Sequence, residues 1–320
     1  MKILILGYSD IVKRRIIPSL MGINQIESID ISSKSSNIKQ KGKISNLYKD
    51  YDDALIKSEA ELVYISLPNS LHYPYLIKTL KNNKNVIVDK PAITKLNQLE
   101  KIEDIIKKKQ LGISMSSVFQ YHKCWKKFKS ISLKNSKEGT LVANFTIPKL
   151  NKDNIRMSKR LDGGAFHDMA IYASSAGYLF WETPLQKLSL FKSSENGLVT
   201  GFNILINYGR GKEFVGRFGF NKTYTNQIQY HGLNFSTKYD RVFSPPPNLD
   251  TYITKETKNK GNKNYVIGYD DSFKNYLTYV IKYLNNDRKQ INREFFNQNY
   301  EYEKLLRQWK KQIKLMFGLI

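Results

Sequence analysis

The chain has 320 residues, of which 52 are Lys or Arg and 28 are Asp or Glu, so its formal net charge is +24. The apolar fraction of 41% and the aromatic fraction of 12% are ample for packed cores, which excludes a disordered chain. A single cysteine, Cys124, excludes an intramolecular disulfide and a Cys-based zinc site, and the four histidines lack metal-ligand spacing. We therefore expect no metal, and at this length two domains.

No apolar run approaches the ~18 residues that a membrane-spanning helix needs. The apolar start of the chain, residues 3–6, reaches Gly7 too soon to form the apolar segment of a signal peptide. We expect a soluble, cytoplasmic protein without a membrane partner.

The sequence pI near 9.7 is high enough to raise the question of nucleic-acid binding. The lysines are spread over the chain rather than gathered in one arm, and no DNA- or RNA-binding signature is present. We therefore expect no nucleic-acid partner. An anionic small substrate or cofactor fits the charge equally well.

The first part of the chain alternates short apolar runs with amphipathic segments. The predicted strands are residues 3–6, 28–31, 62–67, 85–88 and 111–115, and the predicted helices are residues 11–20, 51–57, 71–81 and one carrying Leu99, Ile102, Ile105 and Ile106. Repeated strand–helix units with short connections predict an α/β fold, a doubly wound parallel sheet of the Rossmann type.

After about residue 120 the pattern changes to period-2 alternation. It is visible in residues 141–147, 202–208 and 214–220, and predicts a large, open, mainly antiparallel sheet with one polar face. Residues 163–179, 272–284 and 300–316 read as helices. We therefore expect a dinucleotide-binding domain over residues 1–118 and an α+β domain for substrate binding and oligomerisation over residues 119–320.

The turn after the first strand is the expected place for a cofactor phosphate, because ligands bind at the carboxyl ends of the strands in such sheets. Residues 7–12 read GYSDIV and keep only the first glycine of a G-x-G-x-x-G fingerprint. Ser9 stands at the second glycine and Val12 at the third. We assign Gly7, Ser9, Asp10 and Ile11 to cofactor binding, with the Ser9 hydroxyl as a donor to a phosphate.

The end of the second strand bears on cofactor choice. An NAD site would place Asp or Glu there for the ribose hydroxyls, whereas this chain has Ser33 and Lys34. A hydroxyl followed by a cation suits a 2′-phosphate. We favour NADP(H) and keep NAD(H) as the alternative, with Asp30 as the competing acidic residue.

Three motifs occur in order along the chain. Residues 66–72 read SLPNSLH, residues 88–91 read VDKP and residues 163–172 read GGAFHDMAIY. Together they resemble the Gfo/Idh/MocA oxidoreductases, the family of glucose–fructose oxidoreductase and inositol dehydrogenase. The similarity covers essentially the whole chain, including residues 226–246. The turn GYSDIVKRR at residues 7–15 also resembles that of 3-ketoreductases acting on nucleotide-linked deoxysugars.

The resemblance implies a catalytic lysine at Lys90, with a cis peptide bond before Pro91, and catalytic residues at Asp168 and Tyr172. Residues i and i+4 share one face of a helix, so Asp168 and Tyr172 can reach one ligand. A lysine near a phenol and a carboxylate suits proton transfer at a carbonyl.

The same resemblance implies further contacts. The residues it assigns to the cofactor, besides those of the first turn and the second strand, are Ser66, Pro68, Asn69, His72, Asp89 and Lys90. The residues it assigns to the substrate are Lys90, Tyr121, Arg160, Asp168 and Tyr172. His167 is interpreted as a packed or surface histidine rather than as a proton donor, and Cys124 as a buried or incidental thiol rather than as a nucleophile.

Two departures from the family pattern matter. Asp89 replaces the family glutamate, which shortens the arm toward the nicotinamide ribose, and Ser9 and Val12 change the phosphate turn. They leave open a relative that has lost its cofactor.

The motifs imply an NADP(H)-dependent oxidoreductase that reduces a keto group on a sugar or cyclic polyol, with a nucleotide-linked sugar favoured. The alternatives are an NAD-dependent sugar or inositol dehydrogenase and a non-catalytic member that binds a sugar or a protein partner. The family often dimerises or tetramerises through the second-domain sheet, so a homodimer or homotetramer is expected.

Overall fold

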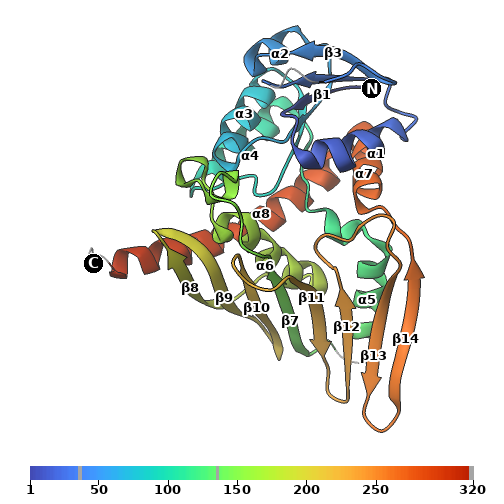
Figure 1. Cartoon of the computed structure of the whole chain (residues 1–320), viewed down its shortest axis with the longest axis vertical. Coiled ribbons are helices and arrows are strands. Elements are labelled where there is room, and N and C mark those ends of the chain that lie inside the picture. The colour runs from blue at the N-terminus through green and yellow to red at the C-terminus, as the bar shows by residue number, and fades with distance from the viewer. Residues whose placement is uncertain (35–37, 135–136, 317–320) are drawn as a thin grey trace. The chain divides into compact units, whose positions relative to one another are not determined.

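The computed structural model describes residues 1–34, 38–134 and 137–316. The chain forms two compact units (Figure 1). Unit 1 consists of Met1–Ser117 and Phe273–Asn299, and unit 2 consists of Val118–Ser272 and the chain from Tyr300 onward.

Unit 1 is built on a six-stranded parallel sheet in the order β3-β2-β1-β4-β5-β6. Its strands are β1 (Lys2–Leu6), β2 (Ser28–Ser32), β3 (Ile44–Tyr48), β4 (Leu62–Ile65), β5 (Asn85–Val88) and β6 (Ile113–Met115). The side chains of β1, β4 and β5 are buried almost throughout, as expected for strands covered on both faces. The strand order reverses between β1 and β4, so the switch point lies where these two strands end. The predicted Rossmann sheet is confirmed.

Helices of unit 1 follow the strands. They are η1 (Val12–Ile16), α1 (Ile17–Met21), α2 (Tyr51–Lys57), α3 (Asn69–Lys81), α4 (Gln98–Lys109) and α7 (Ser272–Asn286). The segment predicted as one helix over residues 11–20 is a π-helical turn followed by α1. Pro18 lies at the start of α1 and has no N–H to donate, so the α-helical pattern would lose a bond there.

Strand β3 was not predicted, because its middle side chains are exposed and it has no apolar period. Residues 273–299 pack in unit 1, although the sequence-based division assigns them to the second domain, residues 119–320. Tyr276 hydrogen-bonds Ser114 (2.8 Å) and Asn292 accepts from the backbone N–H of Ile113 (2.8 Å). These long-range contacts join two late helices to β6.

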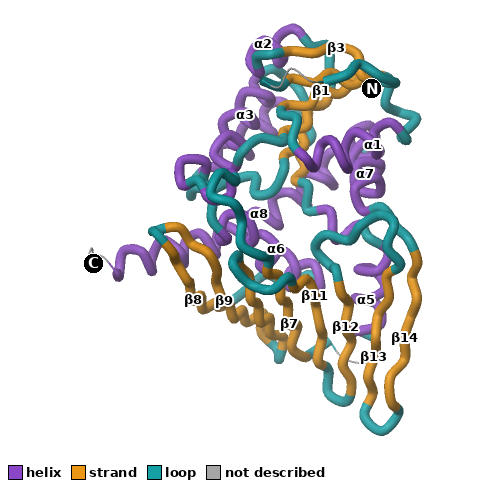
Figure 2. Tube along the Cα trace, viewed as in Figure 1, coloured by secondary structure: helices purple, strands orange, loops and turns teal. Residues whose placement is uncertain are grey.

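Unit 2 contains an eight-stranded sheet in the order β14-β13-β12-β11-β7-β10-β9-β8 (Figure 2). Its strands are β7 (Gly139–Thr146), β8 (Lys187–Glu195), β9 (Leu198–Gly209), β10 (Lys212–Gly219), β11 (Thr225–His231), β12 (Phe235–Asp240), β13 (Thr251–Thr257) and β14 (Gly261–Gly268). Strands β7 and β10 pair in parallel, and the other described neighbours are antiparallel. The expected large, mainly antiparallel sheet is confirmed.

The helices of unit 2 contact its sheet through α6, against β9 and β10, and through α5, against β12. They are η2 (Val118–Tyr121), α5 (Lys123–Leu133), η3 (Ile155–Met157), η4 (Lys159–Leu161), α6 (Ala165–Trp181) and the later part of α8 (Arg288–Met316). Within the described ranges, no helix is long and apolar enough to cross a membrane, and no group of three or more His, Cys, Asp or Glu could hold a metal.

Candidate active site

The turn after β1 requires glycine at its first position. Gly7 has φ +96°, and a Cβ there would lie 2.2 Å from the carbonyl oxygen of Ser66. The Gly7 N–H donates to the carbonyl of Ser32 (2.9 Å). The turn therefore lies against the carboxyl ends of both neighbouring strands, β2 and β4.

Ser9 uses its hydroxyl within the protein. Its Oγ lies 2.8 Å from Ser66 Oγ and 3.3 Å from the backbone N–H of Val12. Because Ser66 donates its single hydroxyl proton to Asp89 (2.6 Å), the proton between the two serines comes from Ser9. The Ser9 hydroxyl thus ties the first turn to β4, and its donation to a phosphate stays a prediction.

Asp89, directly after β5, accepts three hydroxyl protons. Ser66 donates to its Oδ2, and Tyr64 (2.6 Å) and Ser116 (2.8 Å) donate to its Oδ1. Burial, and then the Asp89 carboxylate, raise the pKa of Tyr64 well above its usual value, so the phenol stays a donor. Tyr64 and Ser116 were not among the predicted site residues, because nothing in their own strands marks them. They hold the residue that precedes Lys90.

Lys90 is half-buried and starts a cis peptide bond to Pro91, as the family resemblance implies. His72, in the first turn of α3, holds this segment. Its Nδ1 lies 2.8 Å from the Pro91 carbonyl oxygen and its Nε2 lies 2.6 Å from that of Leu67. Burial lowers the pKa of His72, and the two carbonyls act in the opposite direction. Each ring nitrogen thus faces a backbone carbonyl oxygen, and the neutral ring can donate to one of them, so His72 lies between the end of β4 and Pro91.

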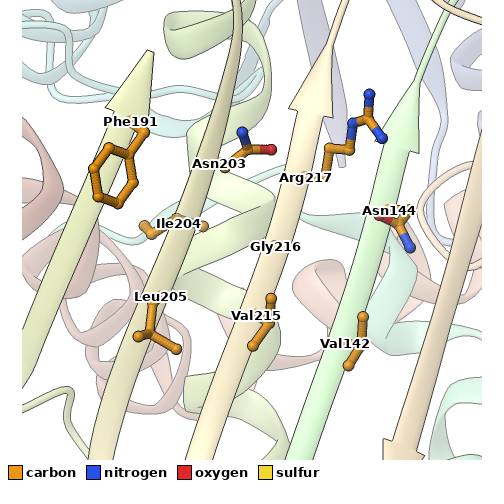
Figure 3. A pocket seen from close by; sticks show the side chains of 9 residues that line it. All are labelled: Val142, Asn144, Phe191, Asn203, Ile204, Leu205, Val215, Gly216 and Arg217. Atoms are coloured by element: carbon orange, nitrogen blue, oxygen red, sulfur yellow. The ribbon is translucent and has the colours of Figure 1, made fainter.

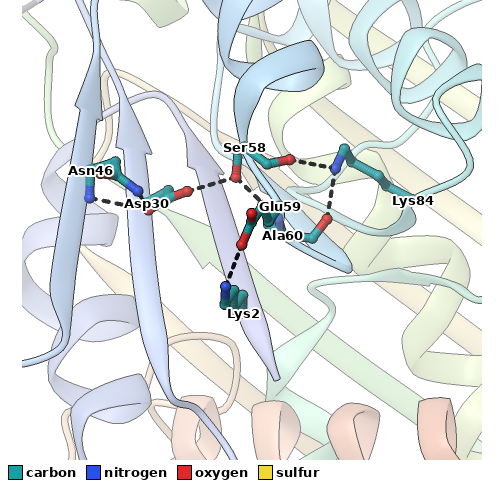
Figure 4. Close-up of polar contacts among 7 residues, drawn as sticks. All are labelled: Lys2, Asp30, Asn46, Ser58, Glu59, Ala60 and Lys84. Atoms are coloured by element: carbon teal, nitrogen blue, oxygen red, sulfur yellow. Dashed lines mark hydrogen bonds and ion pairs between the residues drawn. The ribbon is translucent and has the colours of Figure 1, made fainter.

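The end of β2 presents Ser33, which is buried, and Lys34, which is exposed. Asp30, the competing acidic residue, is 6% exposed and its carboxylate is fully engaged (Figure 4). Its Oδ1 accepts from the backbone (3.1 Å) and side-chain (3.0 Å) amides of Asn46, and its Oδ2 accepts from Ser58 (2.7 Å). Asp30 therefore supports the sheet and is not free to take ribose hydroxyls.

The remaining predicted cofactor residues lie at the same edge of the sheet. Asp10 is exposed and Ile11 half-exposed after β1, and Pro68 and Asn69 begin α3 after β4. All the predicted residues of unit 1 thus follow β1, β2, β4 or β5, where parallel strands present their carboxyl ends.

In unit 2, helix α6 carries Asp168 in its first turn and Tyr172 one turn later. The Tyr172 ring packs between three phenylalanine rings, with centroid distances of 6.2 Å to Phe119, 5.5 Å to Phe145 and 4.9 Å to Phe243. Because these rings come from η2, β7 and the segment after β12, the position of the phenol is set by three parts of the unit.

Asp168 is paired with a cation that the sequence analysis missed. Arg156, in η3, donates from Nε to Asp168 Oδ2 at 3.2 Å. Arg160, the arginine predicted for substrate binding, is exposed in η4, and Tyr121 is half-buried at the end of η2. In the sequence, the two adjacent glycines directly before α6 were the one sign that the preceding loop packs closely against this helix.

His167 is half-buried and Cys124 is buried. The Nδ1 of His167 lies 3.5 Å from the hydroxyl of the fully buried Tyr302, and burial lowers the His167 pKa. Burial raises the pKa of the Cys124 thiol to about 12, which excludes a reactive thiolate near neutral pH.

The residues of unit 1 fit a dinucleotide. Gly7 lets the first turn pack against the carbonyl of Ser66 at the carboxyl ends of the strands, where such sheets bind cofactor phosphates, and Lys34 adds an exposed cation at the neighbouring strand end. A Rossmann sheet with these residues, together with a second unit that carries a carboxylate and a phenol on one helix, fits the class of nicotinamide-dependent oxidoreductases.

Comparison with known proteins agrees with this class. Residues 1–117 match the family model described as an oxidoreductase family with an NAD-binding Rossmann fold, Gfo/Idh/MocA. A dTDP-3,4-didehydro-2,6-dideoxy-α-D-glucose 3-reductase of Streptomyces violaceoruber is 26% identical over 77% of this chain and 74% of its own. A 3-ketoreductase of Actinomadura kijaniata, KijD10, solved with NADP and TDP-benzene, has a TM-score of 0.86 at 23% identity and covers 93% of this chain and 94% of its own. An aldose–aldose oxidoreductase of Caulobacter crescentus has a TM-score of 0.81 at 15% identity, with 98% of both chains covered. The chain is thus similar to oxidoreductases of the Gfo/Idh/MocA family, whose model matches its residues 1–117.

Proposed function

We propose that this protein is an NADPH-dependent reductase of a keto group on a nucleotide-linked sugar. The observation that carries the proposal is similarity to dTDP-sugar 3-reductases over most of the chain, together with the retained Lys90, Asp168 and Tyr172. The Streptomyces relative is named for reduction at C3 of a dTDP-linked dideoxy sugar, and we propose the same class of substrate here.

The choice of NADPH rests on the end of β2. Lys34 is exposed there beside Ser33, whereas the carboxylate of Asp30 is occupied by Asn46 and Ser58. A cation and a hydroxyl suit a 2′-phosphate, and an NAD site would need a free carboxylate. The KijD10 relative was solved with NADP, which supports the same choice.

When bound, the nicotinamide supplies the hydride that reduces the carbonyl carbon. Tyr172 or Lys90 donates the proton that the carbonyl oxygen needs to become a hydroxyl. Asp168 accepts hydrogen bonds from the sugar hydroxyls and orients the ring. Asp89 positions Lys90 through its three hydroxyl partners, and the rings around Tyr172 keep the phenol in place.

The net charge of +24 suits a substrate that carries a diphosphate. A basic protein attracts an anionic ligand and raises its encounter rate. Exposed cations precede α6 in unit 2, among them Lys152, Lys159 and Arg160.

We propose further that a second copy of the chain covers the open face of the unit 2 sheet. Phe191, Leu205 and Val215 project from β8, β9 and β10, and their side chains are 69%, 48% and 39% exposed. Figure 3 shows them beside Val142 of β7, around a depression of about 300 Å³. Because the four strands are adjacent, the apolar groups form one continuous surface of the kind that self-association buries.

The first test is a fluorescence titration with NADPH and, in parallel, NADH. We expect tight binding of NADPH and weak binding of NADH. Lys34→Glu should raise the Kd for NADPH about tenfold or more, because a charge-assisted contact is lost and a repulsion added. Lys41→Glu, at an exposed lysine before β3, is the control. A preference for NADH would favour a catabolic dehydrogenase, and binding of neither cofactor would overturn the proposal.

The second test measures NADPH oxidation with the dTDP-linked 3-keto sugar of the relative's reaction. Lys90→Met should lose turnover by about 100-fold or more while NADPH still binds, because a proton donor next to the carbonyl is removed. Lys95→Met, at an exposed lysine five residues later, should retain the wild-type rate. Full activity of Lys90→Met would show that the assigned site is wrong.

A further inference from the structure

The loop before α6 reaches the helix only because two glycines stand between them. The Gly164 N–H donates to the Arg156 carbonyl (2.7 Å), and the Gly163 N–H donates to the Ser158 carbonyl (2.9 Å). A Cβ on Gly163 would lie 2.5 Å from the Arg156 carbonyl oxygen, and Gly164 has φ +94°. The glycine pair thus sets the backbone of Arg156 against the start of α6.

The side chain of Arg156 then turns to the first turn of α6. Its Nε donates to Oδ2 of Asp168 at 3.2 Å, and the side chains are 45% and 13% exposed, respectively. A hydrogen bond between a guanidinium and a carboxylate combines charge with direction, so it restricts rotation of the carboxylate as well as balancing its charge. Tyr172 lies one turn further along the same helix.

We propose that Arg156 is a positioning residue that holds Asp168 in the orientation needed to bind the sugar. This inference rests on the role of Asp168 in the proposed function. Arg156 acts through Asp168 and makes no contribution of its own to the reacting groups. The competing role for an exposed arginine is a direct contact with a substrate phosphate, and the two roles differ in whether the effect of Arg156 depends on Asp168.

A double-mutant cycle separates these roles. The proteins are the wild type, Arg156→Gln, Asp168→Asn and the double variant, with Arg156→Lys as the conservative variant. We expect Arg156→Gln to lower kcat by about 10- to 100-fold, as a small misplacement of a binding group does, and to leave the Kd for NADPH unchanged. In the Asp168→Asn background the same change should have no further effect on kcat. Arg156→Lys should restore part of the rate, and Lys222→Gln, an exposed cation between β10 and β11, should match the wild type.

The same four proteins are compared by thermal unfolding without ligands, which does not depend on activity. We expect the two single changes to lower Tm by amounts that do not add in the double variant. Additive effects on both Tm and kcat, or a rise in KM that persists in the Asp168→Asn background, would overturn the inference in favour of an independent substrate contact. If the Tm shifts of the variants are not additive and the wild type reduces no keto sugar, the pairing of Arg156 with Asp168 is upheld and the proposed function is overturned instead.

Discussion

The role inferred for Asp89 changes once its hydrogen-bond partners are known. In the sequence it replaces the family glutamate with a shorter side chain, which weakens the prediction of a cofactor site. In the structure Tyr64, Ser66 and Ser116 all donate to its carboxylate, and Ser9 reaches it through Ser66. Two departures from the family pattern, Ser9 and Asp89, are therefore linked by one chain of hydrogen bonds. We infer that the shorter side chain serves to hold the Lys90 segment against β4 and β6.

His122 makes a pH-dependent contact at the residue scale. It is fully buried, and its Nδ1 accepts the backbone N–H of Cys124 (3.1 Å) at the start of α5. Burial lowers the pKa of His122, while nearby Asp270 acts in the opposite direction. A protonated Nδ1 cannot accept this bond, so the cap exists only in the neutral form.

Stability should therefore fall as the pH falls. Since the pKa of His122 is lower in the folded chain than in the unfolded chain, the unfolded state binds more protons below about pH 6.5. The contribution of His122 to the free energy of unfolding is fully present above that pH and is lost as the pH decreases toward the pKa of the folded state. We expect a lower Tm at about pH 5.5 than at about pH 7.5.

The variant that checks this is His122→Asn, which keeps a capping oxygen and removes the titration. Its Tm should depend less on pH than that of the wild type, whatever its absolute value. His231→Asn, at an exposed histidine of β11, should leave the dependence unchanged. An identical pH dependence of wild type and His122→Asn would contradict the assignment.

At the scale of elements, the connection from η4 to α6 depends on the absence of a side chain at Gly163. Gly163→Ala places a methyl group 2.5 Å from a backbone carbonyl that cannot move aside cheaply. We expect a loss of about 1–3 kcal/mol in the free energy of unfolding, as for other overpacked sites. Turnover should also fall, because Arg156 moves away from Asp168, while NADPH binding is retained.

Gly22→Ala is the matched control for that change. Gly22 follows α1, and the nearest atom to an added Cβ is the end of the flexible Lys274 side chain at 3.4 Å. Its stability and activity should stay close to those of the wild type. A stable and fully active Gly163→Ala protein would show that the loop does not need its close approach to α6.

At the scale of the whole molecule, the net charge and the open sheet face have opposite effects on the association of copies of the chain. A net charge of +24 favours separation of the copies in solution, whereas the apolar surface over β7–β10 favours association. The strands alternate buried and exposed side chains, as in β9 and β10, so one face packs on the helices and the other is available to a partner.

We therefore expect an oligomer in light scattering and Val215→Glu to convert it to monomers. The substitution buries an unpaired carboxylate in the proposed interface, and the free energy of desolvating this charge exceeds what one valine contributes to association. Leu233→Glu, at an 89% exposed leucine in the turn between β11 and β12, should leave the mass unchanged. A monomeric wild type would refute the proposed assembly.

The local sequence pattern was sufficient to predict the sheets of both units and the motifs of the candidate site. Apolar runs and their spacing predicted the parallel sheet of unit 1, because strands buried on both faces must be apolar throughout. Alternation predicted the sheet of unit 2. The ordered motifs around Lys90, Asp168 and Tyr172 predicted the similarity to Gfo/Idh/MocA oxidoreductases, since each motif is a short stretch of neighbouring residues.

Only the tertiary structure decided how distant residues combine. Arg156 meets Asp168 across a loop, and Asp89 collects hydroxyls from β4 and β6. Strand β3 and the return of residues 273–299 to unit 1 also lacked a local signal. A polar edge strand has no apolar period, and the partner of a buried hydroxyl or carboxylate is chosen by packing between segments far apart in the chain. Sequence periodicity reports which side of an element is buried, and it carries no information about what that side is buried against.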